Sequence, residues 1–139
     1  MTRAFVDTNI LVYVFDGRVK AKQTRAAQLL EELADRDEAP VLSTQVLQEA
    51  FVALTRKVHM EASDALNTLQ LVEEGTFTVQ AIDARLIWRA AARVIKDRLS
   101  FFDALIVESA LEADCSVLYS EDLQSGRIFD GMTIVNPFN

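Results

Sequence analysis

The chain alternates short apolar runs with longer stretches of helical periodicity, and this alternation constrains its fold more than any other feature. Apolar and β-branched runs predict strands at 3–6, 41–42, 76–80, 116–119 and 133–135. The stretches between them place apolar residues at the i, i+3, i+4, i+7 spacing of an amphipathic helix. Strands that alternate with helices form a mostly parallel sheet covered by helices on both faces, so the sequence predicts an α/β fold.

The helical stretches differ in how much of their surface is apolar. Residues 104–113 are apolar almost all round, which predicts a helix buried on most sides. The helix after Asp83 has a narrower stripe, made of Ile87, Ala90, Ala91, Val94 and Ile95. Four cations lie mostly off that stripe and form either a solvated face or a basic patch for phosphate: Arg85, Arg89, Arg93 and Lys96. The polar segment 17–22 is expected to connect two helices.

Length and composition bound the class of protein. A chain of 139 residues, half of them hydrophobic, is expected to form a single domain, 1–139, with a core of its own. The net charge of −7 is unusual for a nucleic-acid binder, so an RNA or DNA substrate would require bound cations or a basic partner. No signal pattern or apolar run of membrane-spanning length is visible, and a single cysteine fits a reducing cytoplasm.

Two carboxylates lie at positions that are not readily explained as ordinary acids on a solvent-exposed surface. Asp7 follows the first predicted strand, so it either caps the next helix or belongs to a site beyond the strand ends, where ligands of open α/β sheets bind. Glu49 has mostly apolar helical neighbours at Gln45, Val46, Val52 and Ala53. An inward-facing glutamate is costly unless it pairs with an arginine or binds a metal.

Two further acids have comparable positions. Asp103 lies three residues after Ser100, at the spacing of a capping box, in the first turn of the predicted buried helix. Asp122 follows the 116–119 strand, where an ordinary turn acid is the alternative. If these acids converge with Asp7 and Glu49, two like charges about 4 Å apart cost roughly 4 kcal/mol at an effective dielectric of 20, and a divalent cation removes that cost.

The donor types indicate which metal and which chemistry to expect. Carboxylate oxygens favour Mg2+ or Mn2+, and the single histidine and cysteine argue against zinc. A carboxylate-held magnesium site suits phosphodiester hydrolysis, which needs an activated water and neutralised charge on the phosphoryl oxygens. We expect Cys115 to be a buried small hydrophobe and His59 to lie on the surface.

Four motifs, in order along the chain, resemble the PIN-domain ribonucleases. They are residues 5–9 (FVDTN), 43–49 (STQVLQE), 102–106 (FDALI) and 118–123 (LYSEDL). Among PIN domains they look most like the VapC-type toxins of type II toxin–antitoxin systems. The resemblance implies a PIN-like three-layer α/β/α sandwich with a central, mostly parallel sheet of four or five strands.

The resemblance also implies an activity and a site. Asp7 and Asp103 would be the principal metal ligands, and Glu49 and Asp122 would complete an acidic quartet directly or through water. The activity would be an endoribonuclease dependent on Mg2+ or Mn2+, in which an activated water attacks with no covalent enzyme intermediate.

Supporting residues and partners follow from the same resemblance. Asn9 and Ser120 would orient the metal ligands, whereas Glu121 is one residue away from the favoured position. The implied partners are an RNA substrate and a small VapB-like antitoxin, in a homodimer or a toxin–antitoxin hetero-oligomer. Trp88 and Tyr13 are expected to pack in the core, with the lining of an RNA groove as the alternative.

Other classes of protein fit the sequence less well. A haloacid-dehalogenase-like phosphatase needs a second acid two residues after its first, and Asn9 occupies that position. A receiver domain needs paired acids near the amino terminus, where only Asp7 is available. The main non-enzyme alternative is a catalytically silent PIN-like module that binds RNA or protein. Cleavage of DNA is a further alternative, because carboxylate–metal chemistry does not itself select ribose.

Overall fold

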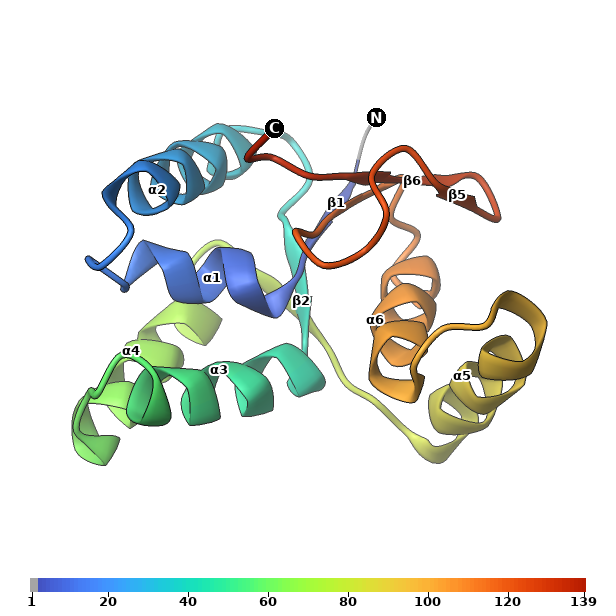
Figure 1. The fold of residues 1–139 in the computed structure, drawn as a ribbon, viewed down its shortest axis with the longest axis horizontal. Coiled ribbons are helices and arrows are strands. Elements are labelled where there is room, and N and C mark those ends of the chain that lie inside the picture. Colours follow the sequence, from blue (N-terminus) through green and yellow to red (C-terminus); the bar gives the residue numbers. More distant parts are fainter. Residues whose placement is uncertain (1–2) are drawn as a thin grey trace.

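A sheet of six strands, ordered β3-β2-β1-β4-β6-β5, organises the computed structural model, which describes residues 3–139 (Figure 1). The strands are β1 (Ala4–Val6), β2 (Val41–Ser43), β3 (Thr78–Gln80), β4 (Val117–Tyr119), β5 (Ile128–Phe129) and β6 (Met132–Val135). All neighbours in this order are parallel except β5, which pairs antiparallel with β6 at the edge. The predicted mostly parallel sheet is confirmed, and β5 adds a short edge that the sequence analysis did not predict.

Helices cover both faces of the sheet. They are α1 (Thr8–Val14), α2 (Lys20–Ala34), α3 (Thr44–Arg56), α4 (Ala62–Glu74), α5 (Ala84–Asp97) and α6 (Phe101–Glu112). Figure 1 shows α1 to α4 on one side of the strands and α5 and α6 on the other, so the predicted three-layer sandwich is confirmed. No helix within residues 3–139 combines the length and the apolar character needed to cross a membrane.

The first helix begins at the cap that the sequence offered, and the second begins earlier than expected. The side chain of Asp7 caps α1 by accepting a hydrogen bond from Thr8 N. The predicted connection 17–22 is too long, because α2 already starts at Lys20. Lys20 and Ala21 are exposed, so the polarity of this segment reflects the solvent-facing first turn of a helix.

The middle of the molecule is built from buried strands and α6. All three residues of β1 are buried, and every residue from Ala104 to Ala110 is buried, as predicted. Cys115 is also buried, and burial raises the pKa of its thiol to about 12. His59 is exposed, which confirms the expectation for that residue.

The apolar stripe predicted on α5 is wrong at one end. Ile95 is 84% exposed, whereas Arg93 is only 7% exposed. The buried face of α5 is made of Leu86, Ala90 and Arg93, which recur at i, i+4 and i+7. Because a carboxylate on the buried face of α6 needs a cation, an arginine occupies the position that periodicity alone assigns to solvent.

The arginines of α5 form ion pairs. Arg93 donates to Glu108 Oε1 at 2.8 Å, to Asp97 Oδ2 at 2.7 Å and to Asp130 Oδ2 at 2.9 Å. Arg85 and Arg89 both pair with Glu112 of α6. Three members of the basic cluster on α5 are therefore engaged with carboxylates and hold α5 against α6 and the β5–β6 hairpin.

Candidate active site

Asp7 lies at the carboxyl end of β1 and directly precedes Thr8, which lines a cleft between α1 and α3. Its backbone N–H donates to Tyr119 O at 3.0 Å, so the ends of β1 and β4 lie side by side. Its carboxylate accepts hydrogen bonds from Thr8 N at 2.7 Å and from Ser120 Oγ at 2.8 Å. The side chain is thus both a helix cap and a buried acid at the strand ends.

Burial determines the acidity of Asp7. The residue is 6% exposed, and desolvation raises its pKa from 3.8 to about 6. The hydrogen bonds from Ser120 and Thr8 lower the pKa, while the negative charges of Asp122 and Glu49 raise it further. Asp7, Glu49 and Asp122 therefore lie within electrostatic reach of one another.

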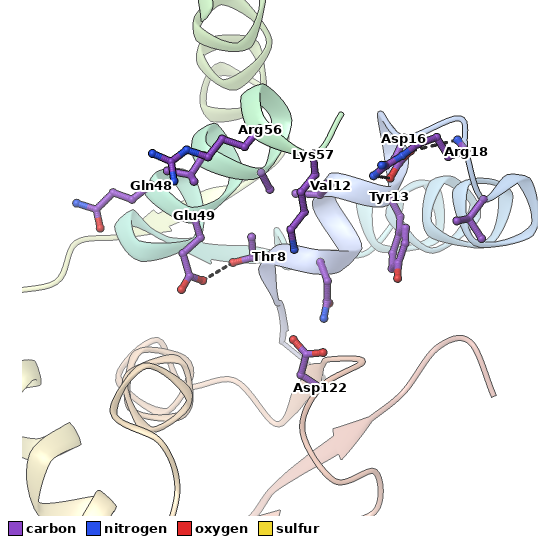
Figure 2. A pocket seen from close by; sticks show the side chains of 14 residues that line it. Thr8, Val12, Tyr13, Asp16, Arg18, Gln48, Glu49, Arg56, Lys57 and Asp122 are labelled. Carbon is purple, nitrogen blue, oxygen red and sulfur yellow. Dashed lines mark hydrogen bonds and ion pairs between the residues drawn. The ribbon is translucent and has the colours of Figure 1, made fainter. Parts of the chain in front are cut away.

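Ser120 ties the loop after β4 to Asp7. While its hydroxyl donates to Asp7, its oxygen accepts from the N–H groups of Asp122 and Leu123, both at 3.2 Å. This arrangement fixes the backbone of Asp122, whose side chain is exposed and faces the cleft from the side opposite Thr8 (Figure 2).

Glu49 projects from α3 into the same region. Its Oε1 accepts from Thr8 Oγ1 at 2.8 Å and its Oε2 accepts from Gln45 Nε2 at 3.3 Å. Within residues 3–139 no arginine pairs with Glu49, so the structural explanation considered for this acid is not the one found. Neutral hydrogen-bond donors hold the carboxylate in place and leave its charge uncompensated.

Asp103 stands in the first turn of α6. Its backbone N–H donates to Ser100 Oγ at 3.2 Å, which matches the predicted capping interaction. Gln45 Nε2 also donates to Phe102 O at 3.1 Å, so one amide links the helix of Glu49 to the start of the helix that carries Asp103. The side chain of Asp103 is half-buried.

The cleft has a volume of about 850 Å³ and is bordered mainly by α1 and α3. Its lining includes Thr8, Asn9, Tyr13, Glu49 and Asp122. Neither Asp7, which directly precedes the lining residue Thr8, nor Asp103 lines it. The structure therefore places Glu49 and Asp122 at the cleft, with Asp7 within electrostatic reach of both and Asp103 on an adjoining helix.

The donor set fits a hard divalent cation, although in the part of the chain that the structure describes no three acidic, histidine or cysteine side chains lie close enough to hold one among themselves. Mg2+ usually keeps several waters and takes only one or two carboxylates, so three are not needed. Asn9 Oδ1 and Gln45 Oε1 are buried with no hydrogen-bond partner within residues 3–139. These oxygens are suited to hold water around a cation.

Two contributors to this region were not predicted from the sequence. Thr8 appears there only within the motif 5–9, and Gln45 only as a neighbour of Glu49. Gln45 is 3% exposed, but its helical neighbours three and four positions on are the polar residues Gln48 and Glu49, so periodicity gives no signal that identifies it. Glu121 accepts from Tyr13 Oη at 2.7 Å and pairs with Lys22, so it anchors its loop to α1 and α2.

The two aromatic residues considered for a groove differ. Tyr13 lines the cleft, where its ring meets Phe138 edge to face. Trp88 is 70% exposed on α5 and does not line the cleft, so the prediction that it packs in the core is wrong.

Comparison with known proteins adds a family and three related structures. The family model for the PIN domain matches residues 4–128. The fold is similar to VapC20 of Mycobacterium tuberculosis, described as a sarcin-ricin loop cleaving toxin, with TM-score 0.70, 20% identity and coverage of 86% of this chain and 89% of that one. No curated protein matches the chain.

Two further structures cover almost the whole chain. A toxin–antitoxin complex from Klebsiella pneumoniae has TM-score 0.70 and 25% identity over 96% of this chain and 97% of that one. VapBC2 of Rickettsia felis, bound to a DNA fragment from its promoter, has TM-score 0.69 and 14% identity over the same shares of the two chains.

Proposed function

This chain belongs to the PIN domain family, and we propose that it is a metal-dependent endoribonuclease, the toxin component of a VapBC-type toxin–antitoxin system. The family match confirms the resemblance read from the four sequence motifs. The observation that carries the proposal is the buried carboxylate of Asp7 at the carboxyl end of β1, with Glu49 and Asp122 at the cleft and within electrostatic reach of it.

The similar structures support this choice of activity and partner. One is described as a toxin that cleaves the sarcin-ricin loop, and two contain or are named for a toxin with its antitoxin. We therefore propose RNA as the substrate and a small VapB-like antitoxin as the partner, with the chain in a homodimer or a toxin–antitoxin hetero-oligomer. We assign it to the cytoplasm, where such a substrate is found.

In the proposed site, Asp7 and Asp103 are the principal ligands of Mg2+ or Mn2+, and Glu49 and Asp122 complete the acidic quartet. The bound cation supplies an activated water and neutralises charge on the phosphoryl oxygens. Thr8 holds Glu49 through its hydroxyl.

Two further residues support the ligands. Ser120 holds Asp7 and the backbone of Asp122 in one hydrogen-bonded unit. Asn9, at the cleft, orients ligands or water through its unpartnered oxygen. Residues that hold metal ligands in this way raise metal affinity by fixing geometry before the ion arrives.

The second candidate function is a PIN-like module that binds RNA or protein without cleaving it. This function is favoured by one observation: within residues 3–139 no three acidic side chains lie close enough to hold a metal among themselves. It is separated from the enzyme by measuring both metal binding and RNA cleavage, because a silent module binds without cutting.

The test is cleavage of RNA by the purified chain, free of antitoxin, with Mg2+ or Mn2+ and with EDTA. Asp103→Asn is the loss-of-function variant, and a contaminating nuclease would persist in it. Asp114→Asn is the matched control. Asp114 is exposed and precedes the amino end of β4, whereas Asp122 follows its carboxyl end. Its positive φ of 59° suits asparagine.

We expect metal-dependent cutting by the wild type and by Asp114→Asn, and none by Asp103→Asn. Cutting by Asp103→Asn at the wild-type rate contradicts the site assignment. Metal binding with no cutting of tRNA, rRNA or mRNA fragments favours the binding module.

A further inference from the structure

Charge is distributed unevenly along the cleft. Three cations line it, Arg18, Arg56 and Lys57, together with Asp16 and the two site acids. Arg18 is engaged with Asp16, which accepts from its guanidinium at 2.9 Å and 2.8 Å. The remaining charges are the carboxylates of Glu49 and Asp122 and two cations, Arg56 at the last position of α3 and Lys57 directly after it.

The backbone positions of the two cations lie well along α3 from Glu49. Arg56 follows Glu49 by seven residues, which is two helical turns or about 10 Å along the axis, and Lys57 is one residue further. Figure 2 shows the Lys57 side chain extending from the end of α3 toward Thr8, while the Arg56 side chain extends toward Gln48. Lys57 therefore reaches back toward the acids while Arg56 lies further along α3, so an RNA strand with one phosphate at the acids can meet both cations with neighbouring phosphates.

Arg56 and Lys57 differ from the arginines of α5 in having no carboxylate partner within residues 3–139. Within residues 3–139, neither Arg56 nor Lys57 forms an ion pair, and both are exposed. By contrast, Arg85, Arg89 and Arg93 are engaged with carboxylates around α6. The two cations also have a structural role. A positive charge at the C-terminal end of a helix interacts favourably with the helix dipole and stabilises the helix by roughly 0.3–1 kcal/mol.

We propose that Arg56 and Lys57 form a subsite for the phosphates of the RNA strand that flank the cleaved phosphate. The inference rests on the proposed function, because it takes RNA as the ligand of the cleft. A chain of net charge −7 repels a polyanion, so binding requires local cations, and these are the unpaired ones that the cleft presents. On α3 between Glu49 and Arg56 lies Val52, 48% exposed, which offers an apolar contact. Contacts to phosphates carry no sequence information, so this pair of cations should contribute equally to the binding of RNAs of different sequence.

The experiment measures how the affinity for RNA depends on salt. Labelled single-stranded RNA of two unrelated sequences is titrated by fluorescence anisotropy between 50 and 200 mM NaCl, in EDTA and on an Asp103→Asn background so that it is not cut. Each phosphate contact on a single strand contributes about 0.7 to the slope of log K against log salt. Arg56→Ala/Lys57→Ala should therefore reduce the magnitude of the slope by about 1.4, so that the parent loses about sevenfold more affinity than the variant over this fourfold range of salt.

The matched control is Arg36→Ala/Lys96→Ala, which removes the same charge from two exposed positions that do not line the cleft. Its slope should equal that of the parent. Arg56→Lys/Lys57→Arg should restore the slope, because both cations remain. Thermal unfolding of each variant measures the dipole contribution separately, since that contribution changes stability and leaves the slope unchanged.

Three results overturn the subsite: an unchanged slope in the Arg56/Lys57 variant, an equal change in the control, or an effect confined to one RNA sequence. An unchanged RNA slope with weaker binding of a cognate antitoxin assigns the pair to the protein partner and also overturns it. Cleavage by the unmutated chain, assayed separately, decides the proposed function, so that a failure of the subsite and a failure of the nuclease give different results.

Discussion

Replacing Asp7 by asparagine should stabilise the metal-free protein at neutral pH. The folded-state pKa of Asp7 is about 6, against an ordinary value of 3.8, and the main cause is burial. Below pH 3.8 the carboxyl is protonated in both the folded and the unfolded chain. As the pH rises toward 6, the unfolded chain ionises first, so the folded state binds more protons and stability falls with pH.

The size of this effect follows from the shift. A difference of about two pKa units corresponds to about 3 kcal/mol of stability lost by the time the pH exceeds 6. Asp7→Asn removes the titration, so the free energy of unfolding of the variant minus that of the wild type should increase by about 2.4 kcal/mol between pH 4 and pH 7. All other acids are common to both chains and cancel in this difference.

Urea titrations at pH 4, 5, 6, 7 and 8 in EDTA measure that difference, with Asp114→Asn as the control for the loss of one carboxylate at an exposed position. A difference between Asp7→Asn and wild type that is flat across this range refutes the reasoning about burial. Mg2+ at 100 times its Kd should stabilise the wild type by about 2.7 kcal/mol. Asp7→Asn should gain much less if Asp7 is a metal ligand.

Three other perturbations test the packing, the support of the site and the thiol. Arg93→Met should lower the free energy of unfolding by about 3–5 kcal/mol because it removes the 2.8 Å partner of the buried carboxylate of Glu108 and leaves only Arg89, at 3.5 Å, and adding Glu108→Leu should restore most of it. Chemical denaturation measures both, and an equal loss in the single and double variants would show that the charge of Glu108 is not the cause. Gln45→Ala should raise the Mg2+ concentration for half-maximal RNA cleavage by about 10–100-fold, because it frees Glu49 and the start of α6. An unchanged metal requirement would mean that Gln45 does not orient Glu49. The Cys115 thiol should react with a disulfide reagent at pH 8 roughly a thousandfold more slowly in the folded chain than in urea, since its pKa is raised from 9.0 to about 12. Equal rates would show that the thiol is accessible.

Local pattern was sufficient for the order of the elements and for several site positions. The strands lie within two residues of their predicted places, and α6 is buried as its uniform apolarity predicted. Asp7 and Asp122 were recognised because each follows a strand, and parallel strands end at the same edge of a sheet. One readable signal was passed over, because Asp130–Gly131, with φ values of 47° and 89°, is the typical turn of the β5–β6 hairpin.

Tertiary structure alone decided which side chains meet. Gln45 reaches Phe102 across 57 residues of sequence, Ser120 reaches Asp7 across 113, and Arg93 reaches Asp130 across 37. Periodicity placed Arg93 in solvent and Ile95 in the core, and the structure reverses both because α5 packs against the charged residue Glu108 of α6.

The physical reason is the range of each interaction. Helix and strand periods, caps and turns depend on residues a few positions apart, so a single sequence carries them directly. The burial of a charge, the acidity of Asp7 and the line of cations along the cleft depend on which elements pack together. That choice is made by the core as a whole, and it becomes visible only when the chain is folded.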